Sequence, residues 1–396
     1  MDSSSFESIT EEMLQSLIDN KAVENLQLEF KGYCFENGKV TDKQKTDILK
    51  EIAAFSNAYG GQIIIGIEEE KGIASKLQNV GCSPEDFDGI QLAIQQAMLA
   101  KVRPRIYGIT MERIEVAEDM NAIIINVPKS FNRPHAVNEG GKDSFFIRHS
   151  NGVIHMSVDD LRKQFIYSAS FKYDMRNFRQ ERIGMILGNE CIGNLVDGAK
   201  VLLHIVPLWS LDVGNSIDIK QLQHLYSHKI RPISGSGWYH RYNSDGYCVS
   251  SKAPNEENTV NTYVQVFRNG LIEALDIRLM NYNGQFQGQV YDWRQSETSV
   301  YKAIKRYTDL LRELNIPKPW YIFVSLLNAK GFRSDSFYFG TSESIDRDII
   351  HATECVWDDD NRTLGEILKP TLDSLANAFG MPESPNYDKQ GNYREE

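Results

Sequence analysis

Three glutamates near the start of the chain have the residue type and spacing for metal-assisted chemistry on a phosphate. Glu24 and Glu29 lie close together in the sequence, and Glu68 follows a run of isoleucines. Three carboxylates in one place repel one another unless a proton or a cation lies among them. Mg²⁺ and Mn²⁺ prefer carboxylate oxygens, and such ions activate water and stabilise charge on a phosphate. If the three side chains converge, they form a candidate metal site.

The same acids also fit a role without chemistry. Charged residues are mostly exposed in proteins, and residues 68–70 are consecutive glutamates of the kind that solvate the end of a strand. Spacing alone does not separate the two interpretations. Whether the acids form a metal site depends on whether the strands and the helix that carry them bring the side chains together.

A strand, a helix and a second strand are predicted to position these acids. Apolar and polar residues alternate in residues 26–31, so Glu29 and Lys31 are expected side by side on the open face of a strand. Residues 48–59 repeat apolar side chains at helical spacing, and the glycine pair that follows ends the helix. Residues 62–67 then form a short strand rich in isoleucine. If both strands belong to one sheet, the carboxylates can meet.

More helices and strands are predicted in the same half of the chain. Apolar residues recur at helical spacing in residues 9–19 and 84–100, whereas residues 105–116 and 122–127 have the composition of a β-hairpin. Residues 157–168 form another helix, after which we predict a break. The combination is an α+β fold, with a mixed sheet and flanking helices.

Basic side chains of this half lie in loops and at predicted strand ends. If they surround the carboxylates, they would hold phosphates while a metal ion performs the chemistry. Loops are polar in most proteins, however, so each of these residues also fits the role of an ordinary surface residue. The candidates for nucleic-acid binding are Arg103, Arg105, Lys129, Arg133, His135 and Arg148.

Several motifs in this order resemble the AlbA-2 domain of the Schlafen family. The first is Glu24, four residues, then Glu-Phe-Lys, followed by a helix that ends Ala-Phe-Ser-Asn-Ala-Tyr-Gly-Gly and a strand that ends Ile-Gly-Ile-Glu. Later matches are Arg-Pro-Arg-Ile at 103–106, Arg-Pro-His at 133–135 and Phe-Ile-Arg at 146–148. The resemblance covers about residues 10–168, which is less than half of the chain.

The resemblance implies roles for individual residues. Nuclease members of the family cut transfer and ribosomal RNA at a site of three carboxylates, the first two of which fall here on Glu24 and Glu29. The third, an aspartate in the family pattern, falls on Glu68, and the neighbouring Glu69 could take its place. Lys31 would supply a further positive contact. Because glutamate is one methylene longer than aspartate, residue 68 departs from the family pattern.

Three functions are compatible with these residues. The first is a metal-dependent endoribonuclease that uses Mg²⁺ or Mn²⁺. The family resemblance implies structured RNA such as tRNA as its substrate and, for a bacterial protein, a role as an effector of stress or antiviral defence. The alternative is a non-catalytic, nucleic-acid-binding regulator of AlbA-2 type, in which the acids serve only as local electrostatics. A third is an interaction platform that a partner protein triggers.

Composition indicates an ordinary globular protein with more than one domain. The 396 residues suffice for two or three cores, and no apolar run approaches the length of a membrane span, so we expect no membrane partner. Five scattered cysteines never stand at zinc spacing, which argues for a reducing, cytoplasmic location and against a structural zinc. The net charge of −11 argues against unselective coating of nucleic acid but leaves local binding open.

The chain is predicted to contain three segments. Residues 1–170 form the AlbA-2-like domain, residues 171–380 form a second domain of α+β or α/β type and unassigned fold, and residues 381–396 form a polar tail. All five tryptophans lie in the second domain, where core packing is a commoner role than base stacking. This domain is expected to hold RNA or to bind a trigger protein. A single AlbA-2-like lobe is half of the clamp in two-lobed relatives, so we expect a homodimer or larger homo-oligomer.

Overall fold

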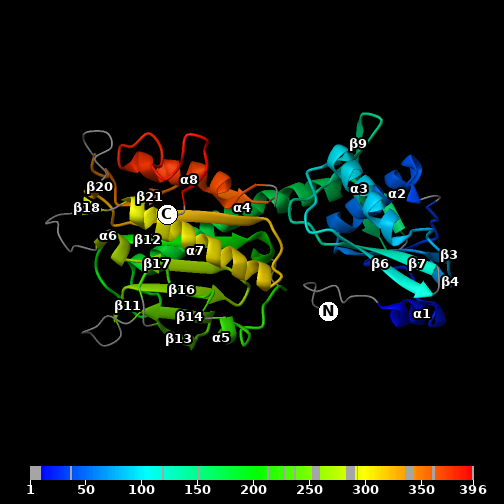
Figure 1. Cartoon of the computed structure of the whole chain (residues 1–396), viewed down its shortest axis with the longest axis horizontal. Helices are drawn as coiled ribbons and strands as arrows, with labels where there is room; N and C mark the ends of the chain where they lie inside the picture. The colour runs from blue at the N-terminus through cyan, green and yellow to red at the C-terminus, as the bar shows by residue number, and fades with distance from the viewer. Residues whose placement is uncertain are drawn as a thin grey trace. The chain divides into compact units, whose positions relative to one another are not determined.

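The computed structural model divides into two compact units, with the boundary in the chain after Lys172. Helix α4 (Val158–Leu187) runs across this boundary, and each unit is described by itself below. The structure, drawn in Figure 1, describes residues 10–35, 38–117, 120–149, 152–211, 214–225, 228–235, 238–251, 259–281, 290–291, 293–334, 343–358 and 362–394.

Two four-stranded sheets and a hairpin form the strands of the N-terminal unit. The first sheet has the order β1-β2-β7-β6, the second has the order β10-β9-β8-β5, and β3 pairs with β4. Strand β1 is parallel to β2, whereas the other pairs of the first sheet are antiparallel, so the predicted mixed sheet and α+β class are confirmed. The strands are β1 (Leu28–Lys31), β2 (Gly61–Ile65), β3 (Ile67–Glu70), β4 (Ile73–Leu77), β5 (Val102–Arg103), β6 (Thr110–Ala117), β7 (Met120–Val127), β8 (Ala136–Glu139), β9 (Lys142–His149) and β10 (Gly152–His155).

Helix α2 (Asp42–Asn57) is the central helix of this unit. It begins at a capping box, in which the Thr41 hydroxyl accepts the Gln44 amide N–H and the Gln44 side chain accepts the Thr41 N–H. The apolar face of the helix packs against both sheets and against α3 (Pro84–Lys101). The buried side chains of this core include Ile48, Ile52, Phe55, Ile63, Ile94, Ile125, Val137 and Phe146.

A second core lies on the other face of the first sheet. Phe30 of β1 and Ile64 of β2 pack there with Leu14 of α1 (Glu11–Asp19). Because side chains alternate along a strand, Glu29 lies on the opposite face from Phe30. That opposite face is the one that turns toward α2.

The turn after α2 depends on a glycine and an asparagine. Gly60 has a φ of +73°, and a Cβ at this position would lie 2.7 Å from the backbone nitrogen of Lys129, so only glycine fits without a shift. The buried Asn57 amide donates to the carbonyls of His135 at 3.0 Å and Phe146 at 2.8 Å, which ties the end of α2 to β8 and β9. The helix therefore ends at Asn57, slightly before the predicted end at residue 59.

Helix α4 is longer than the sequence suggested. We predicted a helix over 157–168 and then a break, but one helix covers Val158–Leu187. The prediction of a break is wrong because no glycine or proline interrupts residues 158–183, so nothing in the chain stops the helix there.

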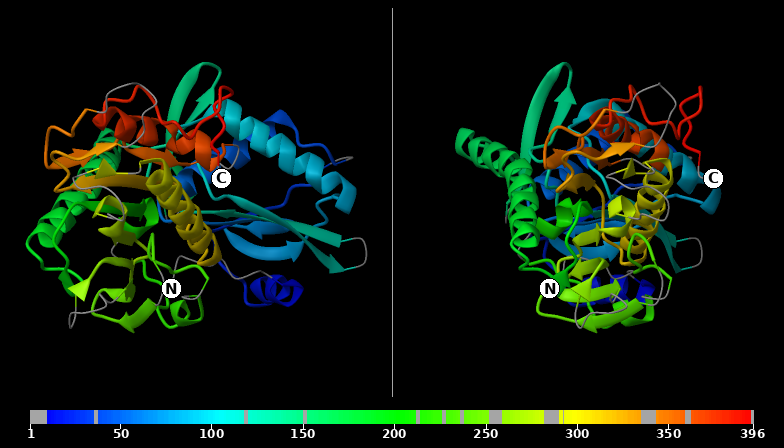
Figure 2. Two further views of the ribbon diagram at one scale, coloured as in Figure 1. Left: turned by 60° about the vertical axis from the view of Figure 1, so that its left-hand side comes forward. Right: turned by 90° about the vertical axis from the view of Figure 1, so that its left-hand side faces the viewer.

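An antiparallel sheet of eight strands forms the C-terminal unit, with the order β13-β14-β16-β17-β12-β19-β21 and with β22 also paired to β19. Helix α7 (Trp293–Glu313) lies across this sheet in Figure 1, as the turned views of Figure 2 also show. The strands of the sheet are β12 (Lys200–Pro207), β13 (Trp238–Tyr242), β14 (Gly246–Ser251), β16 (Thr262–Phe267), β17 (Ile272–Asp276), β19 (Trp320–Leu327), β21 (Ile349–His351) and β22 (Cys355–Trp357). The remaining elements are β11 (Asn194–Leu195), β15 (Thr259–Val260), β18 (Val290–Tyr291), β20 (Arg333–Ser334), η2 (Leu208–Leu211), α5 (Leu222–Leu225), α6 (Arg278–Asn281) and α8 (Leu364–Ala378).

A buried charge cluster ties α4 to this sheet. The carboxylate of Glu273, on β17, accepts two hydrogen bonds of 2.8 Å from the Arg182 guanidinium and one of 2.8 Å from the Tyr263 hydroxyl. His204 Nε2 lies 2.9 Å from the same carboxylate. Burial opposes ionisation, but the hydrogen bonds from Arg182 and His204 lower the pKa of Glu273 to about 2.

The prediction of a polar tail over residues 381–396 is wrong for residues 381–394, the part that the structure describes; residues 395–396 lie outside it. Met381 and Tyr387 are buried, and the Tyr393 ring stacks on Tyr301 of α7 with ring centroids 3.9 Å apart. Ser384 also donates a 2.6 Å hydrogen bond to the buried Glu297 carboxylate. A few apolar and aromatic side chains are enough to hold an otherwise polar segment against the unit.

Candidate functional site

Glu29 lies at the centre of a buried cluster of charges. It is only 4% exposed, and its carboxylate forms ion pairs with Lys31 of the same strand and with Arg148 of β9. Glu51 of α2 completes the cluster, with its carboxylate 3.1 Å from Lys31 Nζ and 3.0 Å from Arg148 Nη1. Two acids and two bases therefore neutralise one another. These four residues are called the Glu29 cluster below.

The prediction that Glu29 and Lys31 share one face of β1 agrees with this pairing, but the prediction that this face is open to solvent is wrong. Helix α2 and strand β9 cover it. Sequence reasoning also missed Glu51, although a signal was present. Glu51 follows Ile48 by three residues and precedes Ile52, so it lies on the apolar stripe of α2, where an acid needs a buried partner.

Arg148 holds the fold together and is not available to a phosphate. Besides its two ion pairs, it donates to the carbonyl of Asn25 at 3.1 Å and to that of Leu28 at 3.2 Å. Its guanidinium also lies 4.9 Å from the centre of the Phe55 ring. The residue is 3% exposed, so the predicted nucleic-acid-binding role for Arg148 is wrong.

Burial and the neighbouring charges shift the pKa values of Glu51 and Lys31 in the cluster. Burial raises the pKa of Glu51, and the nearby Lys31 opposes this shift. For Lys31, burial disfavours the charged form, yet Glu51 and Glu29 together raise the pKa of its amine. Lys31 thus stays cationic and serves as the partner of two acids.

Glu24 enters from the lead-in to β1 and is half-buried. Its carboxylate accepts the backbone N–H of Phe30 at 3.1 Å. Burial raises the pKa of Glu24, and the negative charges of Glu29 and Glu69 add to the increase. Of the acids in the β3–β4 hairpin, Glu69 is therefore the one whose charge acts on Glu24.

Glu68 belongs to a different interaction. Its carboxylate lies 3.1 Å from Lys76 Nζ, its partner across the hairpin, in an ion pair open to solvent. The Cγ of Glu68 would lie 2.9 Å from a Cβ built at Gly32, so this side chain packs on the backbone that follows β1. Glu68 is thus held by the hairpin rather than by Glu24 and Glu29.

The three predicted metal ligands do not form a ready-made metal site. Within the described part of the chain, no three acidic, histidine or cysteine side chains are grouped so that they could hold a metal ion. The charge of Glu29 is already balanced by Lys31 and Arg148, and Glu68 is paired elsewhere. A divalent cation at Glu24, Glu29 and Glu68 therefore does not fit the residues as they stand.

Two more of the predicted nucleic-acid ligands also maintain the fold. His135 is fully buried, and its Nδ1 lies 2.7 Å from the Pro104 carbonyl, so Nδ1 carries the proton. Burial lowers the pKa of His135 to about 4. Arg133 donates to the Ala58 carbonyl at 2.9 Å, and its guanidinium lies 4.0 Å above the Tyr167 ring. The prediction that His135 contacts nucleic acid is wrong, because solvent does not reach it.

The other three predicted basic residues remain at the surface. Arg103 and Arg105 are exposed, and Lys129 is half-exposed, with its amine 5.8 Å from the centre of the Phe131 ring. Arg103 ends β5, Arg105 lies in the loop after it, and Lys129 lies in the loop after β7, so these residues occupy loops and a strand end as the sequence predicted. They are the part of the predicted basic set that an anionic ligand can reach.

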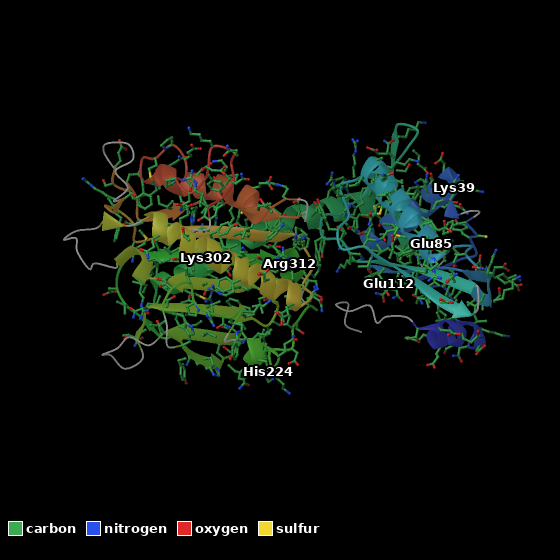
Figure 3. The ribbon with its side chains drawn as sticks, viewed as in Figure 1. Lys39, Glu85, Glu112, His224, Lys302 and Arg312 are labelled. Atoms are coloured by element: carbon green, nitrogen blue, oxygen red, sulfur yellow. The ribbon has the colours of Figure 1, made fainter. Side chains whose placement is uncertain are left out.

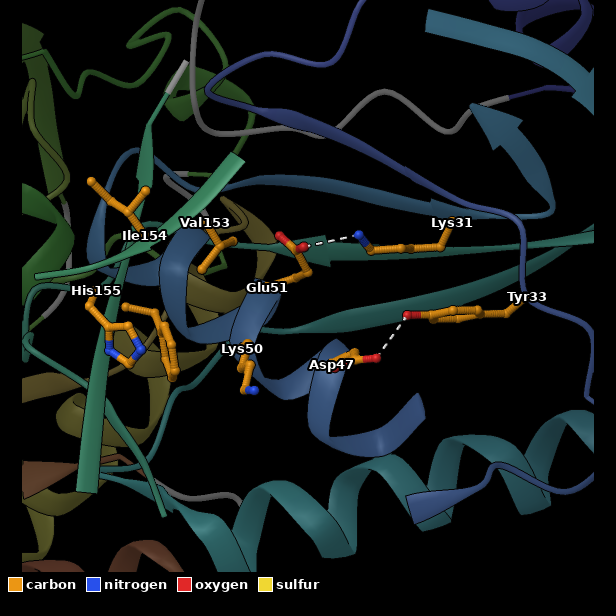
Figure 4. Close-up of a pocket in the computed structure, with 9 residues that line it drawn as sticks. Lys31, Tyr33, Asp47, Lys50, Glu51, Val153, Ile154 and His155 are labelled. Carbon is orange, nitrogen blue, oxygen red and sulfur yellow. Dashed lines mark hydrogen bonds and ion pairs between the residues drawn. The ribbon is translucent and has the colours of Figure 1, made fainter. Parts of the chain in front are cut away.

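A pocket of about 340 Å³ opens beside the Glu29 cluster. Figure 4 shows Lys31 extending toward Glu51, and the Tyr33 hydroxyl toward Asp47, on its walls. The residues that line the pocket are Lys31, Tyr33, Asp47, Lys50, Glu51, Phe146, Val153, Ile154 and His155.

Residues 24–157 match the family described as Schlafen, AlbA_2. The N-terminal part of this chain is a Schlafen AlbA-2 domain. The resemblance proposed from Glu24, the Glu-Phe-Lys motif and the later Arg-Pro motifs is thus confirmed. The match covers both sheets, α2, α3, the Glu29 cluster and the pocket.

Other comparisons are weaker. No curated protein matches the chain. The crystal structure of the DIP2311 protein from Corynebacterium diphtheriae is similar with a TM-score of 0.23 and 16% identity, over 37% of this chain and 26% of that one. The solution structure of the N-terminal domain of a RecG-related protein from Nitrosomonas europaea is similar with a TM-score of 0.27 and 16% identity, over 38% of this chain and 92% of that one.

The AlbA-2 domain thus brings together some predicted site residues and separates others. Glu29 and Lys31 meet in the Glu29 cluster, where Arg148 joins them, and Glu24 lies within electrostatic reach. Glu68 is paired with Lys76. In the described part of the chain, no helix combines the length and the apolar character needed to cross a membrane.

Proposed function

We propose that the AlbA-2 domain binds nucleic acid without cutting it, and that the protein is a nucleic-acid-binding regulator. The Schlafen AlbA-2 match supports a function linked to nucleic acid. The observation that carries the non-catalytic part is the state of Glu29, which is 4% exposed and paired with Lys31 and Arg148. A carboxylate held by two cations contributes to the fold and has little free charge to offer a metal ion.

The exposed cations Arg103 and Arg105, with Lys129, are the proposed contacts to the phosphate backbone. Because the whole chain carries a net charge of −11, binding has to come from such a local group rather than from the overall field. Phosphate contacts of this kind release counterions, so the affinity should fall as salt is added.

Fluorescence anisotropy with labelled RNA and DNA tests the binding surface. The double substitution Arg103→Glu and Arg105→Glu should weaken binding and should reduce the slope of log K against log salt by up to about 1.4 for single strands. The matched control is the double substitution Lys302→Glu and Lys330→Glu, which reverses the charge of two exposed lysines of the C-terminal unit. Lys302 is labelled in Figure 3. Equal loss in both double variants would contradict a local site, because both change the net charge equally.

A second candidate is the metal-dependent endoribonuclease acting on structured RNA such as tRNA. Burial first, and then the charges of Glu29 and Glu69, raise the pKa of Glu24. This favours the nuclease, since neighbouring acids attract cations. The test is incubation of tRNA with the protein and Mn²⁺ or Mg²⁺, with and without EDTA. Intact RNA bound in the presence of either metal supports the regulator.

Substituting Glu68 and Glu69 separately makes the cutting assay more specific. If RNA is cut, Glu69→Gln should reduce cutting more than Glu68→Gln, because Glu69 interacts with Glu24 whereas Glu68 is paired with Lys76. Metal-dependent cutting that Glu24→Gln abolishes, in a variant of unchanged stability, would replace the regulator by the nuclease. A homo-oligomer, a trigger protein bound by the C-terminal unit, and a role in antiviral defence stay proposals that rest on the family resemblance.

A further inference from the structure

The pocket beside the Glu29 cluster has the size for a small organic group. Its volume of about 340 Å³ is at the lower end of the range of small-molecule sites, about 300–1,000 Å³. Its walls come from the end of β1, from α2, from β9 and from β10, all within the AlbA-2 domain.

One wall of the pocket is aromatic. The Phe146 ring is 5% exposed and supports the ring of the exposed His155, with centroids 4.6 Å apart and planes inclined by 39°. A flat ring that is backed by another ring and open on its far side offers a surface on which an unpaired base can stack.

The two lysines of the pocket are already paired with acids. Lys31 is shared by Glu29 and Glu51, and Lys50 lies 2.8 Å from the Glu139 carboxylate. A phosphate would need surplus positive charge here, and these pairs leave none. The site is therefore better suited to a neutral ligand.

The polar groups that remain include both donors and acceptors. The Asp47 carboxylate accepts a long hydrogen bond, of 3.5 Å, from the Tyr33 hydroxyl. Burial raises the pKa of Tyr33, so its hydroxyl stays protonated at neutral pH. The edge of a nucleobase also carries donors and acceptors side by side, which matches this combination of a carboxylate and a hydroxyl group.

Ile154 provides a further, independent observation. This apolar side chain lines the pocket and is 45% exposed. Next to an aromatic wall, exposed apolar surface indicates a place where a flat, partly apolar group is covered on binding.

We propose that this pocket receives one unpaired nucleobase, stacked on His155 and contacted at its edge by Asp47 and Tyr33. The proposal deepens the proposed function and rests on it. It assigns the ligand class, which is nucleic acid with a single-stranded, looped or bulged nucleotide rather than an uninterrupted duplex.

The experiment compares two RNA hairpins of the same stem, one fully paired and one with a single bulged nucleotide, by fluorescence anisotropy on the full chain. Base stacking on an aromatic side chain corresponds to about a 5- to 150-fold change in affinity, so wild-type protein should bind the bulged hairpin more tightly by that factor. His155→Ala should remove the difference. His155→Phe should retain it, because the ring remains.

Leu92→Ala is the matched control, since Leu92 is a 54% exposed apolar residue on α3 and does not line the pocket. It should bind both hairpins as wild type does. Equal, tight binding of both hairpins, unchanged by His155→Ala, would overturn the base pocket while the proposed function stands. Failure to bind either hairpin, or any other nucleic acid, would overturn both.

Discussion

The Glu29 cluster allows a quantitative test of the claim that its acids are structural. Removing one partner from a buried ion pair costs about 3–5 kcal/mol, because the other charge is left without compensation. In Glu29→Ala, Glu51 still holds Lys31 at 3.1 Å and Arg148 at 3.0 Å. We therefore expect a loss of unfolding free energy near the lower value, about 3 kcal/mol.

Arg148→Met should be more damaging than Glu29→Ala. It leaves Glu29 and Glu51 with Lys31 as their common partner, and it removes the donor from the carbonyls of Asn25 and Leu28, now bonded at 3.1 and 3.2 Å. The Leu28 carbonyl keeps its bond from the Asn25 N–H at 3.1 Å, so what is lost here is two hydrogen bonds from a charged donor, which contribute about 1.5–3 kcal/mol each. The expected loss is at least about 5 kcal/mol, which equals the whole unfolding free energy of a domain at the lower end of the usual range of about 5–15 kcal/mol.

The placement of the tryptophans separates the two units in the assay. All five tryptophans follow residue 208, so tryptophan fluorescence in a urea titration follows the C-terminal unit. Hydrogen exchange by mass spectrometry on peptides covering 24–31 and 142–149 follows β1 and β9. Both variants should lose protection in these peptides while the tryptophan transition stays in place.

Lys76→Ala is the control, because the Lys76–Glu68 pair has side chains that are 67% and 37% exposed. Exposed pairs contribute about 0–1 kcal/mol, so this variant should exchange like wild type. If Glu29→Ala also exchanges like wild type, the cluster is not structural. Glu29 would then be free for chemistry, as the nuclease requires.

Three further predictions concern pH and the turn after α2. Burial lowers the pKa of His135 from 6.5 to about 4, so the folded domain disfavours the protonated side chain. The AlbA-2 domain should therefore lose stability as the pH falls from 6.5 toward 4. Hydrogen exchange across this range should show a loss that is smaller in His135→Asn. Glu273 has a pKa lowered from 4.5 to about 2, so the C-terminal unit should lose on the order of 3 kcal/mol as pH falls through that window. Urea midpoints from tryptophan fluorescence should fall with pH in the wild type. If they fall equally in Glu273→Gln, Glu273 is not the cause of the loss. Gly60→Ala should lower the melting temperature more than Gly140→Ala. Both glycines have a positive φ, but a Cβ at Gly60 would lie 2.7 Å from backbone, whereas nothing lies within 4 Å of a Cβ at Gly140. Equal shifts in melting temperature would show that the close approach at Gly60 is unimportant.

Local features of the AlbA-2 domain could be predicted because neighbours in the chain determine them. The alternation in β1 placed Glu29 and Lys31 on one face, and the periodicity of α2 with the glycines behind it predicted the helix and its turn. The family motif likewise depends on residues close in sequence. These features need only backbone geometry and side-chain direction.

Partners from distant parts of the chain could not be predicted in the same way. Arg148 reaches Glu29 across 119 positions of sequence, and no spacing rule predicts which arginine does so. The partner of Glu68 was also determined in space, because the β3–β4 pairing places Lys76 opposite it. The tail was misjudged for the same reason, since Tyr393 stacks on Tyr301, which lies far away in the sequence.

By itself the sequence determined the strand, helix and turn that carry the acids, the α+β class and the family of the first domain, because local sterics and periodicity control these. Only the tertiary structure decided what the acids do. The polar face of β1 is solvent-exposed only if nothing packs on it, and α2 and β9 do pack on it. Burial then requires each charge to find an opposite charge, and this requirement turned a predicted metal ligand into part of an ion cluster.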